Sequence, residues 1–197
     1  MFVAIPRHDR LRDFVETAIQ RLYGDRYGAC LSSFAPTLLA ELDEYGHVTC
    51  AAGIRFGGEK FFFEHYLDRP IEKTLQAHVG GHIKRETIVE VCHLAGNGGS
   101  GSLPFVAQLI RFLRSFDTEW AVFTATRPLR GLLQRNHLAM IELGTADRNR
   151  VPNPESWGRY FDYDPRLMAV DDRAAIEPRK AALRPTSRQF EANARIF

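Results

Sequence analysis

The stretch that decides the fold runs Leu94-Ala95-Gly96-Asn97-Gly98-Gly99-Ser100-Gly101-Ser102-Leu103-Pro104. It joins a β-rich run, Thr87 to Leu94, to a helical pattern from Pro104 to Phe116, which predicts a strand, a loop and a helix in that order. The four glycines let the backbone fold tightly, and Ser102 can cap the helix. Amides at a helix start carry the positive end of the helix dipole and attract phosphate. We therefore expect an anion site here, with a plain flexible connection as the alternative.

The sequence after this glycine loop continues the same alternation. Trp120 to Thr126 is nearly all apolar or β-branched, as in a strand buried on both faces. Leu129, Leu132 and Leu133 mark a short helix, and Ala139 to Leu143 follows as another strand. The order β-α-β-α-β predicts a mainly parallel sheet in this half of the chain. Because the loop lacks the Lys-Ser/Thr ending of a Walker P-loop, nucleotide hydrolysis is disfavoured.

The first half predicts helices packed on a β-hairpin. Apolar residues recur at helical spacing from Leu11 to Tyr23, and two β-rich runs, Thr37 to Leu42 and Val48 to Phe56, flank a short turn with a glycine. Phe61 to Leu67 is predicted as a further strand, and Pro70 to Val79 as a helix that begins at proline and ends at glycines. The fold class expected is α/β (α+β), a mixed sheet flanked by helices.

Composition limits the possible classes of protein. The chain has 197 residues, 45% of them hydrophobic, which suits one globular domain over residues 1–170 and a charged, mobile tail over 171–197. A net charge of +2 argues against nucleic-acid binding. Cys30, Cys50 and Cys92 are odd in number and widely spaced, so neither a disulfide framework nor a metal site is expected. With no signal peptide and no run of about 20 apolar residues, a cytoplasmic protein without a transmembrane segment is expected.

Several motifs in one order resemble the thermostable hemolysin family over roughly residues 10–170. The motifs are FFEHYLDRPIE at 62–72, IVEVCHLA at 88–95, WAVFTAT at 120–126, Ala-Asp at 146–147 and WGRYF at 157–161. The family's usual stretch is Glu-Val-Gly-Asn-Leu-Ala, from which Cys92 and His93 depart. This pattern is similar to the GNAT acyltransferases and, more distantly, to the acyl-homoserine-lactone synthases.

The resemblance implies an acyl donor, either acyl-CoA or the phosphopantetheine of an acyl carrier protein, and a small amine acceptor. In GNAT proteins two parallel strands splay beside the glycine loop, which leaves backbone amides to bind pantetheine and polarise the thioester carbonyl. The cofactor-binding residues implied are Val91, Cys92, Leu94, Gly96, Asn97, Gly98, Gly99, Ser100, Gly101, Ser102 and Arg127. A tyrosine that protonates the leaving thiolate in many GNAT enzymes is missing from the helix predicted over residues 127–137.

Glu90 is the first candidate for a catalytic base. Strand alternation places Ile88, Glu90, Cys92 and Leu94 on one face, where apolar neighbours raise the pKa of a carboxyl group. A glutamate lies near this position in the acyl-homoserine-lactone synthases. The alternative is a salt bridge from Glu90 to one of two arginines, Arg85 or Arg55.

Other polar residues near the predicted site have both a functional and a structural interpretation. Glu64 and Tyr66 share one face of the predicted strand and His65 the other, which makes Glu64 the next catalytic candidate and the other two candidate substrate contacts. His93 could act as a base or a phosphate partner. Cys92 could carry an acyl group, although a strand thiol among apolar residues is usually inert. The alternative for each is the more common one, an ordinary structural residue in a hydrogen-bond network or an apolar core.

Three functions remain open from the sequence. The first is acyl transfer to the amine of an amino acid or another small metabolite, with Phe61, Phe62 and Phe63 lining a tunnel for a long acyl tail. The second is a hemolysin-like protein that acts on membranes. The third is a GNAT-fold binding module without catalytic activity.

Overall fold

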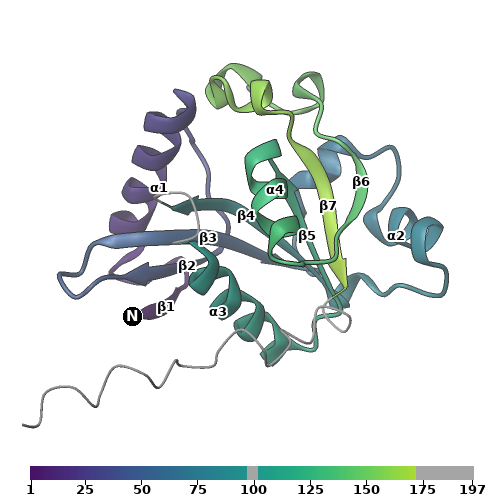
Figure 1. Cartoon of the computed structure of the whole chain (residues 1–197), viewed down its shortest axis with the longest axis horizontal. Helices are drawn as coiled ribbons and strands as arrows, with labels where there is room; N and C mark the ends of the chain where they lie inside the picture. Colours follow the sequence, from purple (N-terminus) through teal and green to yellow (C-terminus); the bar gives the residue numbers. More distant parts are fainter. Residues whose placement is uncertain (97–101, 172–197) are drawn as a thin grey trace, which may run out of the picture.

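The protein folds around one seven-stranded sheet with the strand order β1-β2-β3-β4-β5-β7-β6 (Figure 1). We describe it from a computed structural model over residues 1–96 and 102–171. The strands are β1 (Phe2–Ile5), β2 (Thr37–Leu42), β3 (Val48–Phe56), β4 (Ile88–Gly96), β5 (Trp120–Ala125), β6 (Ile141–Thr145) and β7 (Arg166–Asp171). The helices are α1 (Arg12–Tyr27), α2 (Ile71–Val79), α3 (Leu103–Leu113) and α4 (Arg127–Arg135). Among the helices of these residues, none combines the length and the apolar character needed to cross a membrane.

The sheet is mixed, as expected for the fold class, but the expected parallel C-terminal half is wrong. β4 and β5 pair in parallel, whereas β7 lies between β5 and β6 and pairs antiparallel with both. The chain therefore turns back after β6, and β7 takes the position beside β5 that β6 was expected to occupy. Sequence analysis missed β1 and β7. Asp171, expected in the tail, is the last residue of β7. Residues 172–197 of that tail lie outside the described residues.

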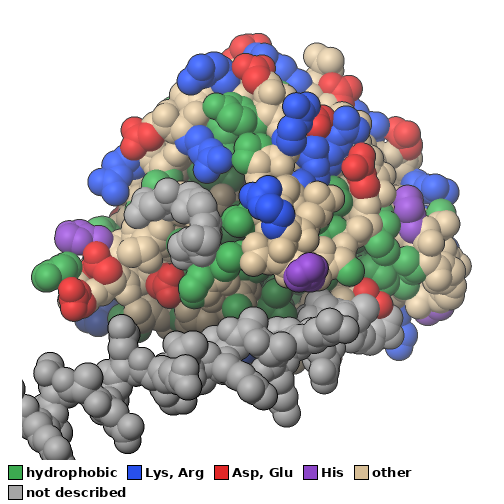
Figure 2. All heavy atoms as spheres, in the orientation of Figure 1, with side chains coloured by type: hydrophobic (Ala, Val, Ile, Leu, Met, Phe, Trp, Pro, Cys, Tyr) green, Lys and Arg blue, Asp and Glu red, His purple; other side chains and the backbone are tan. Residues whose placement is uncertain are grey.

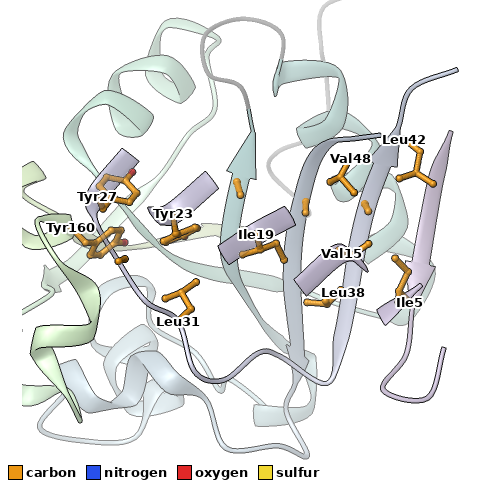
Figure 3. Packing of buried hydrophobic residues seen from close by; sticks show 14 residues of the cluster. Ile5, Val15, Ile19, Tyr23, Tyr27, Leu31, Leu38, Leu42, Val48 and Tyr160 are labelled. Atoms are coloured by element: carbon orange, nitrogen blue, oxygen red, sulfur yellow. The ribbon is translucent and has the colours of Figure 1, made fainter. Parts of the chain in front are cut away.

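Helix α1 covers one face of strands β1 to β4 (Figure 3). Val15 and Ile19 pack fully buried against Leu38, Ala40 and other sheet residues. The helix continues one turn beyond the expected end, to Tyr27, and stops where Gly28 adopts φ 65°. This left-handed conformation suits glycine because it has no Cβ. The added turn brings a tyrosine of α1 towards the middle of the sheet.

Helix α2 and a short 3-10 turn cover the rest of the same face. The strand expected over Phe61 to Leu67 is wrong: Phe62–Tyr66 forms the 3-10 turn. Phe61 and Phe63 stack with ring centroids 4.9 Å apart and are fully buried beside α2. The amides of Phe62 and Phe63 point at the carboxylate of Glu90, so they are unavailable for a sheet ladder.

Helices α3 and α4 cover the opposite face. Phe105, Leu109 and Leu113 of α3 pack on alternate residues of the sheet, including Val89 and Val91. Ser102 is the N-cap residue of α3, as predicted, although its side chain makes no capping hydrogen bond. Two layers of helices thus enclose the sheet, and the site lies where its two central strands separate.

Candidate functional site

The candidate site is a cavity of about 190 Å³ at the point where β4 and β5 separate. The two strands pair in parallel up to Val91 and Phe123, although β4 runs on to Gly96 and β5 to Ala125. The cavity reaches both faces of the sheet through this opening. On the α3 and α4 side it is lined mainly by apolar residues, Val106, Leu109, Ile110, Leu113, Ala121, Phe123, Leu129, Leu133 and Leu138. On the α1 side it is lined by Arg55, Glu90, Cys92, His93 and several aromatic rings.

A bulge in β4 forms the wall of this opening. The register between β3 and β4 shifts between Ala51 and Gly53, and His93 adopts φ 51°. The bulge interrupts the strand alternation that sequence analysis assumed. Cys92 stays on the face of Glu90, but Leu94 packs with the residues under α3 on the other face. The expectation that Leu94 shares the face of Glu90 is therefore wrong.

Glu90 lies on the wall of the cavity and is 2% exposed. Its carboxylate accepts hydrogen bonds from Arg55 Nη1 at 3.0 Å and from the amides of Phe62 at 2.9 Å and Phe63 at 3.2 Å. Burial raises the pKa of Glu90, and the neighbouring guanidinium partly offsets this. Of the two arginines considered as salt-bridge partners, the structure pairs Glu90 with Arg55. The ion pair borders the cavity, so the carboxylate also remains within reach of a small molecule there.

Cys92 lies beside the same guanidinium. Arg55 Nη1 is 3.2 Å from Cys92 Sγ, and the sulfur is 3.2 Å from His93 Nδ1. Burial raises the pKa of the Cys92 thiol, so it stays protonated near neutral pH. This environment argues against a nucleophilic cysteine.

His93 is a buried, neutral imidazole. Its ring packs 5.3 Å from Phe34 and 6.5 Å from Tyr23, measured between centroids. Burial, and to a smaller extent the charges of Arg55 and Arg12, lower the pKa of His93 to about 3. A base with such a pKa has little tendency to take up a proton at neutral pH. The geometry favours a structural role at the bulge over the catalytic role considered for His93.

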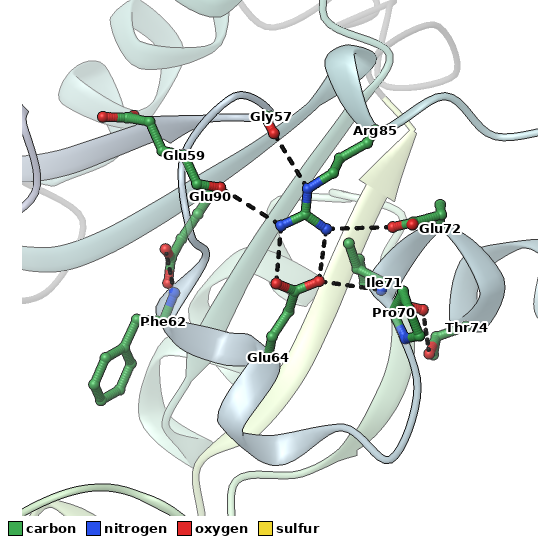
Figure 4. A network of polar contacts seen from close by, with 10 residues as sticks. All are labelled: Gly57, Glu59, Phe62, Glu64, Pro70, Ile71, Glu72, Thr74, Arg85 and Glu90. Carbon is green, nitrogen blue, oxygen red and sulfur yellow. Dashed lines mark hydrogen bonds and ion pairs between the residues drawn. The ribbon is translucent and has the colours of Figure 1, made fainter.

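Glu64 belongs to a separate network of ion pairs (Figure 4). Both oxygens of Glu64 accept from Arg85, at 2.7 and 2.9 Å, and Arg85 also contacts Glu72 at 3.3 Å. The hydrogen bonds from Arg85 hold the pKa of Glu64 below its usual value. Glu64 is not among the described residues that line the cavity, and nor is His65. The carboxylate of Glu64 holds the 3-10 turn to α2, which favours a structural role for Glu64 over a catalytic one.

Of the two candidate substrate contacts, the structure brings one to the cavity. Tyr66 lines it, and burial raises the pKa of the phenol, which stays neutral. The ring of His65 packs against the cavity residue Phe62 at 5.3 Å but is not itself among the described residues that line the cavity. Tyr66 and His65 lie in a 3-10 turn and not in a strand, and of these two only Tyr66 lies at the cavity.

Sequence analysis missed three tyrosines of the cavity wall. Tyr23 and Tyr27 lie one helical turn apart on α1, and their rings meet Tyr160 at 6.3 and 5.2 Å. The amide of Arg159 donates to Tyr27 O at 2.7 Å, which docks the Tyr160 segment on the end of α1. The signal available in the sequence was the i, i+4 spacing of Tyr23 and Tyr27, which becomes informative only if α1 extends to Tyr27.

The residues expected to bind a cofactor fall into three groups. Val91, Cys92 and Leu94 line the cavity, and Gly96 and Ser102 lie at the two ends of the glycine loop. Asn97, Gly98, Gly99, Ser100 and Gly101 lie outside the described residues. Arg127 is 78% exposed at the start of α4, where it is 3.7 Å from Asp164. Lys and Arg side chains gather on the molecular face that carries α4 and the segment before β7 (Figure 2).

Solved structures share this architecture at low sequence identity. The N-acyl amino acid synthase FeeM from uncultured soil microbes matches with TM-score 0.59 and 11% identity, over 89% of this chain and 94% of that chain. The CoA-dependent acyl-homoserine lactone synthase BjaI, solved with SAM and isopentyl-CoA, matches with TM-score 0.59 and 13% identity, over 88% and 83%. The synthase LasI matches with TM-score 0.55 and 14% identity, over 87% and 90%. The chain therefore has the GNAT-like fold that its motifs predicted.

No curated protein matches the chain in sequence. The family model described as thermostable hemolysin matches residues 5–176, which is most of the chain and includes strands β2 to β7 and the last residue of β1. The chain belongs to the thermostable hemolysin family.

Proposed function

We propose that this protein is an N-acyltransferase that moves an acyl group from acyl-CoA or acyl carrier protein to the amine of a small acceptor. The observation that carries the proposal is the cavity that passes through the sheet where β4 and β5 separate. One half is apolar and suits an acyl chain, and the other half contains a carboxylate beside a cation. A thioester at the opening would face both halves.

The chemistry follows from the residues on the polar side. Glu90 would take a proton from the acceptor's ammonium group, and the free amine would attack the thioester carbonyl. The C–N bond forms, the C–S bond breaks, and the second proton that the nitrogen loses as the amide forms passes to the departing thiolate. The phenols of Tyr66 and Tyr160 in the cavity wall stay neutral, because burial raises their pKa values, and can donate a hydrogen bond to the departing sulfur. They would take the place of the tyrosine that many GNAT enzymes use and that residues 127–137 of this chain lack.

The described residues fit the pantetheine arm of the donor. Beyond Val91 the edge of β4 faces the cavity and not β5, so its backbone groups can bond an extended amide-bearing chain. The glycine loop would hold the phosphates at the start of α3, and Arg127 is exposed on the same side of the sheet, at the start of α4. The donor supplies the activated carbonyl.

The acyl chain would lie between α3 and α4 on the sheet. The lining residues Val106 to Leu113 span about 10 Å along α3, at 1.5 Å per residue. Each buried methylene favours binding by about 0.8 kcal/mol, so donors longer than acetyl are preferred. The phenylalanine tunnel predicted from the sequence is wrong in part: Phe62 lines the cavity, whereas Phe61 and Phe63 are core residues beside α2.

Calorimetric titration with coenzyme A, acyl-CoA and holo carrier protein tests donor binding. Gly99→Val should weaken binding at least tenfold, because a β-branched side chain obstructs close approach of the loop to phosphate. Gly58→Val is the matched control, since an added Cβ at Gly58 meets no atom within 4 Å. A folded Gly99→Val protein with unchanged affinity would exclude the loop as the phosphate site. Absence of binding to all three donors would contradict the proposal itself.

A further inference from the structure

Arg55 and Glu90 are the only charged residues among the described residues that line the cavity. Their side chains are 13% and 3% exposed, and Arg55 Nη1 lies 3.0 Å from Glu90 Oε2. The neighbouring Cys92 and His93 are neutral, since burial raises the pKa of the thiol and lowers that of the imidazole. The polar half of the cavity therefore contains one cation and one anion in contact.

The guanidinium of Arg55 has N–H donors that make no hydrogen bond to the described residues. Nη1 contacts both Glu90 Oε2 and Cys92 Sγ, while Nε and Nη2 make no hydrogen bond to any of the described residues. Neither atom is fully buried, because in residues 1–96 and 102–171 the only fully buried side-chain nitrogen or oxygen without a partner is Trp120 Nε1, and Arg55 is one of the residues that line the cavity. An arginine fork with two unused donors in a mostly buried site is suited to a planar oxyanion such as a carboxylate.

We propose that Arg55 binds the carboxylate of the acceptor, so that the acceptor is a free α-amino acid held as a zwitterion. The inference rests on the proposed acyl transfer and assigns its acceptor class. The ammonium group lies against Glu90 and the carboxylate against Arg55, so each charge of the ligand meets the opposite charge of the pair. A plain amine would neutralise Glu90 and leave the buried guanidinium without a counter-charge, which is unfavourable in a site with little water.

Aromatic rings surround the space beside this ion pair. Phe62 and Trp157 meet at 5.5 Å between centroids, and Trp157 and Tyr160 at 5.3 Å. All three line the cavity, together with Tyr66. A side chain that projects from the bound amino acid enters this ring of aromatics, so apolar amino acids are preferred over charged ones.

The first experiment uses the unmodified protein with coenzyme A present. Binding of the twenty amino acids is measured by calorimetry, and the best ligand is compared with its decarboxylated amine and its carboxamide. We expect the amine and the carboxamide to bind at least ~30-fold more weakly, since each leaves a buried charge unpaired. An amine that binds within threefold of its amino acid, or a panel without a binding amino acid, would overturn the assignment.

The second experiment compares Arg55→Lys with Arg85→Lys. Both replace an ion-paired arginine, but Arg85 bonds Glu64 outside the cavity lining. Arg55→Lys should raise the KM for the amino acid at least tenfold, leave the KM for the donor unchanged, and reduce the preference for amino acid over amine. Arg85→Lys should change none of these. A merely structural Arg55 would lower the thermal midpoint while the preference stays intact, and that result would overturn the proposal.

The two proposals fail in distinguishable ways. If amino acids bind with dependence on Arg55 but no donor is bound or consumed, acyl transfer is wrong and the zwitterion site stands. If the donor is consumed with plain amines as readily as with amino acids, acyl transfer stands and the role assigned to Arg55 is wrong.

Discussion

Replacing His93 by asparagine should remove much of the acid sensitivity of the fold. His93 is buried at the β4 bulge with φ 51°, a conformation that asparagine tolerates better than most residues. Its pKa is lowered from 6.5 to about 3 by burial and by the charges of Arg55 and Arg12. In the unfolded chain the imidazole takes up a proton near pH 6.5, whereas in the folded protein it does not. The stability that this group contributes is therefore complete above pH 6.5 and is lost as the pH falls towards 3.

The size of the effect follows from the two pKa values. Each pH unit in this window costs about 1.4 kcal/mol for one proton, so lowering the pH from 6.5 to 4 removes about 3 kcal/mol. For a protein of this length that corresponds to roughly 6–12 °C in the thermal midpoint. His93→Asn lacks the titrating group, so its midpoint should fall by that much less over the same range. Other titrating groups contribute equally to both proteins and cancel in the comparison.

The assay is thermal unfolding followed by circular dichroism from pH 7.5 to 4. The control is His137→Asn, because His137 is an exposed residue outside the cavity lining and has a similar left-handed φ of 61°. The wild type and the control variant both retain His93, so their stability should fall in parallel as the pH is lowered. The stability of His93→Asn should fall less. Equal pH slopes for all three would refute the conclusion that His93 is a buried neutral residue and would restore it as a candidate base.

Four further substitutions test the site. Glu90→Gln should lower turnover about 100-fold or more if the carboxylate is the base. Glu64→Gln should mainly lower the thermal midpoint, because it weakens the Arg85 network. Similar losses of turnover in both variants would contradict a catalytic role for Glu90 and a structural role for Glu64. Gly53→Ala should destabilise the fold and shift the bulge, because an added Cβ would lie 2.8–2.9 Å from three side chains. The shift should appear as changed amide hydrogen exchange in β4. A variant with wild-type stability would be inconsistent with this packing. Ala121→Phe should fill part of the apolar half of the cavity, which Ala121 lines. It should therefore reduce the transfer of long acyl chains but not of acetyl. An equal loss for all donors would argue against the apolar half as the binding site of the acyl chain.

The elements that sequence analysis found are those with strong local patterns. The hairpin strands, α2, and the strand and helix that flank the glycine loop follow from periodicity, proline and glycine. The 3-10 turn at Phe62–Tyr66 was mistaken for a strand because three successive phenylalanines have high β-propensity, whereas its backbone amides bond Glu90 across 28 residues of sequence. That contact is tertiary and has no local signature. β7 was missed for a similar reason, since its position depends on the chain returning between two other strands.

The candidate site could be located from the sequence but its details could not. The succession of a strand, glycines and a helix directed attention to the end of β4, and Glu90, Cys92 and Leu94 of that strand do line the cavity. The choice of Arg55 over Arg85 as its partner depends on the register of β3 against β4, in which Arg55 lies opposite Glu90. The bulge at His93 turns Leu94 to the other face, and strict alternation could not reveal it.

Product analysis tests the central claim most directly. The purified protein is incubated with acyl-CoA donors from acetyl to dodecanoyl, and with acylated carrier protein, in a mixture of amino acids. Mass spectrometry of the products and a thiol assay of the released donor are read from the same reaction. We predict N-acyl amino acids in amounts equal to the released thiol, and their loss in Glu90→Gln. Hydrolysis of the donor without amide formation, or no consumption of any donor, would contradict the assignment of this protein as an N-acyltransferase.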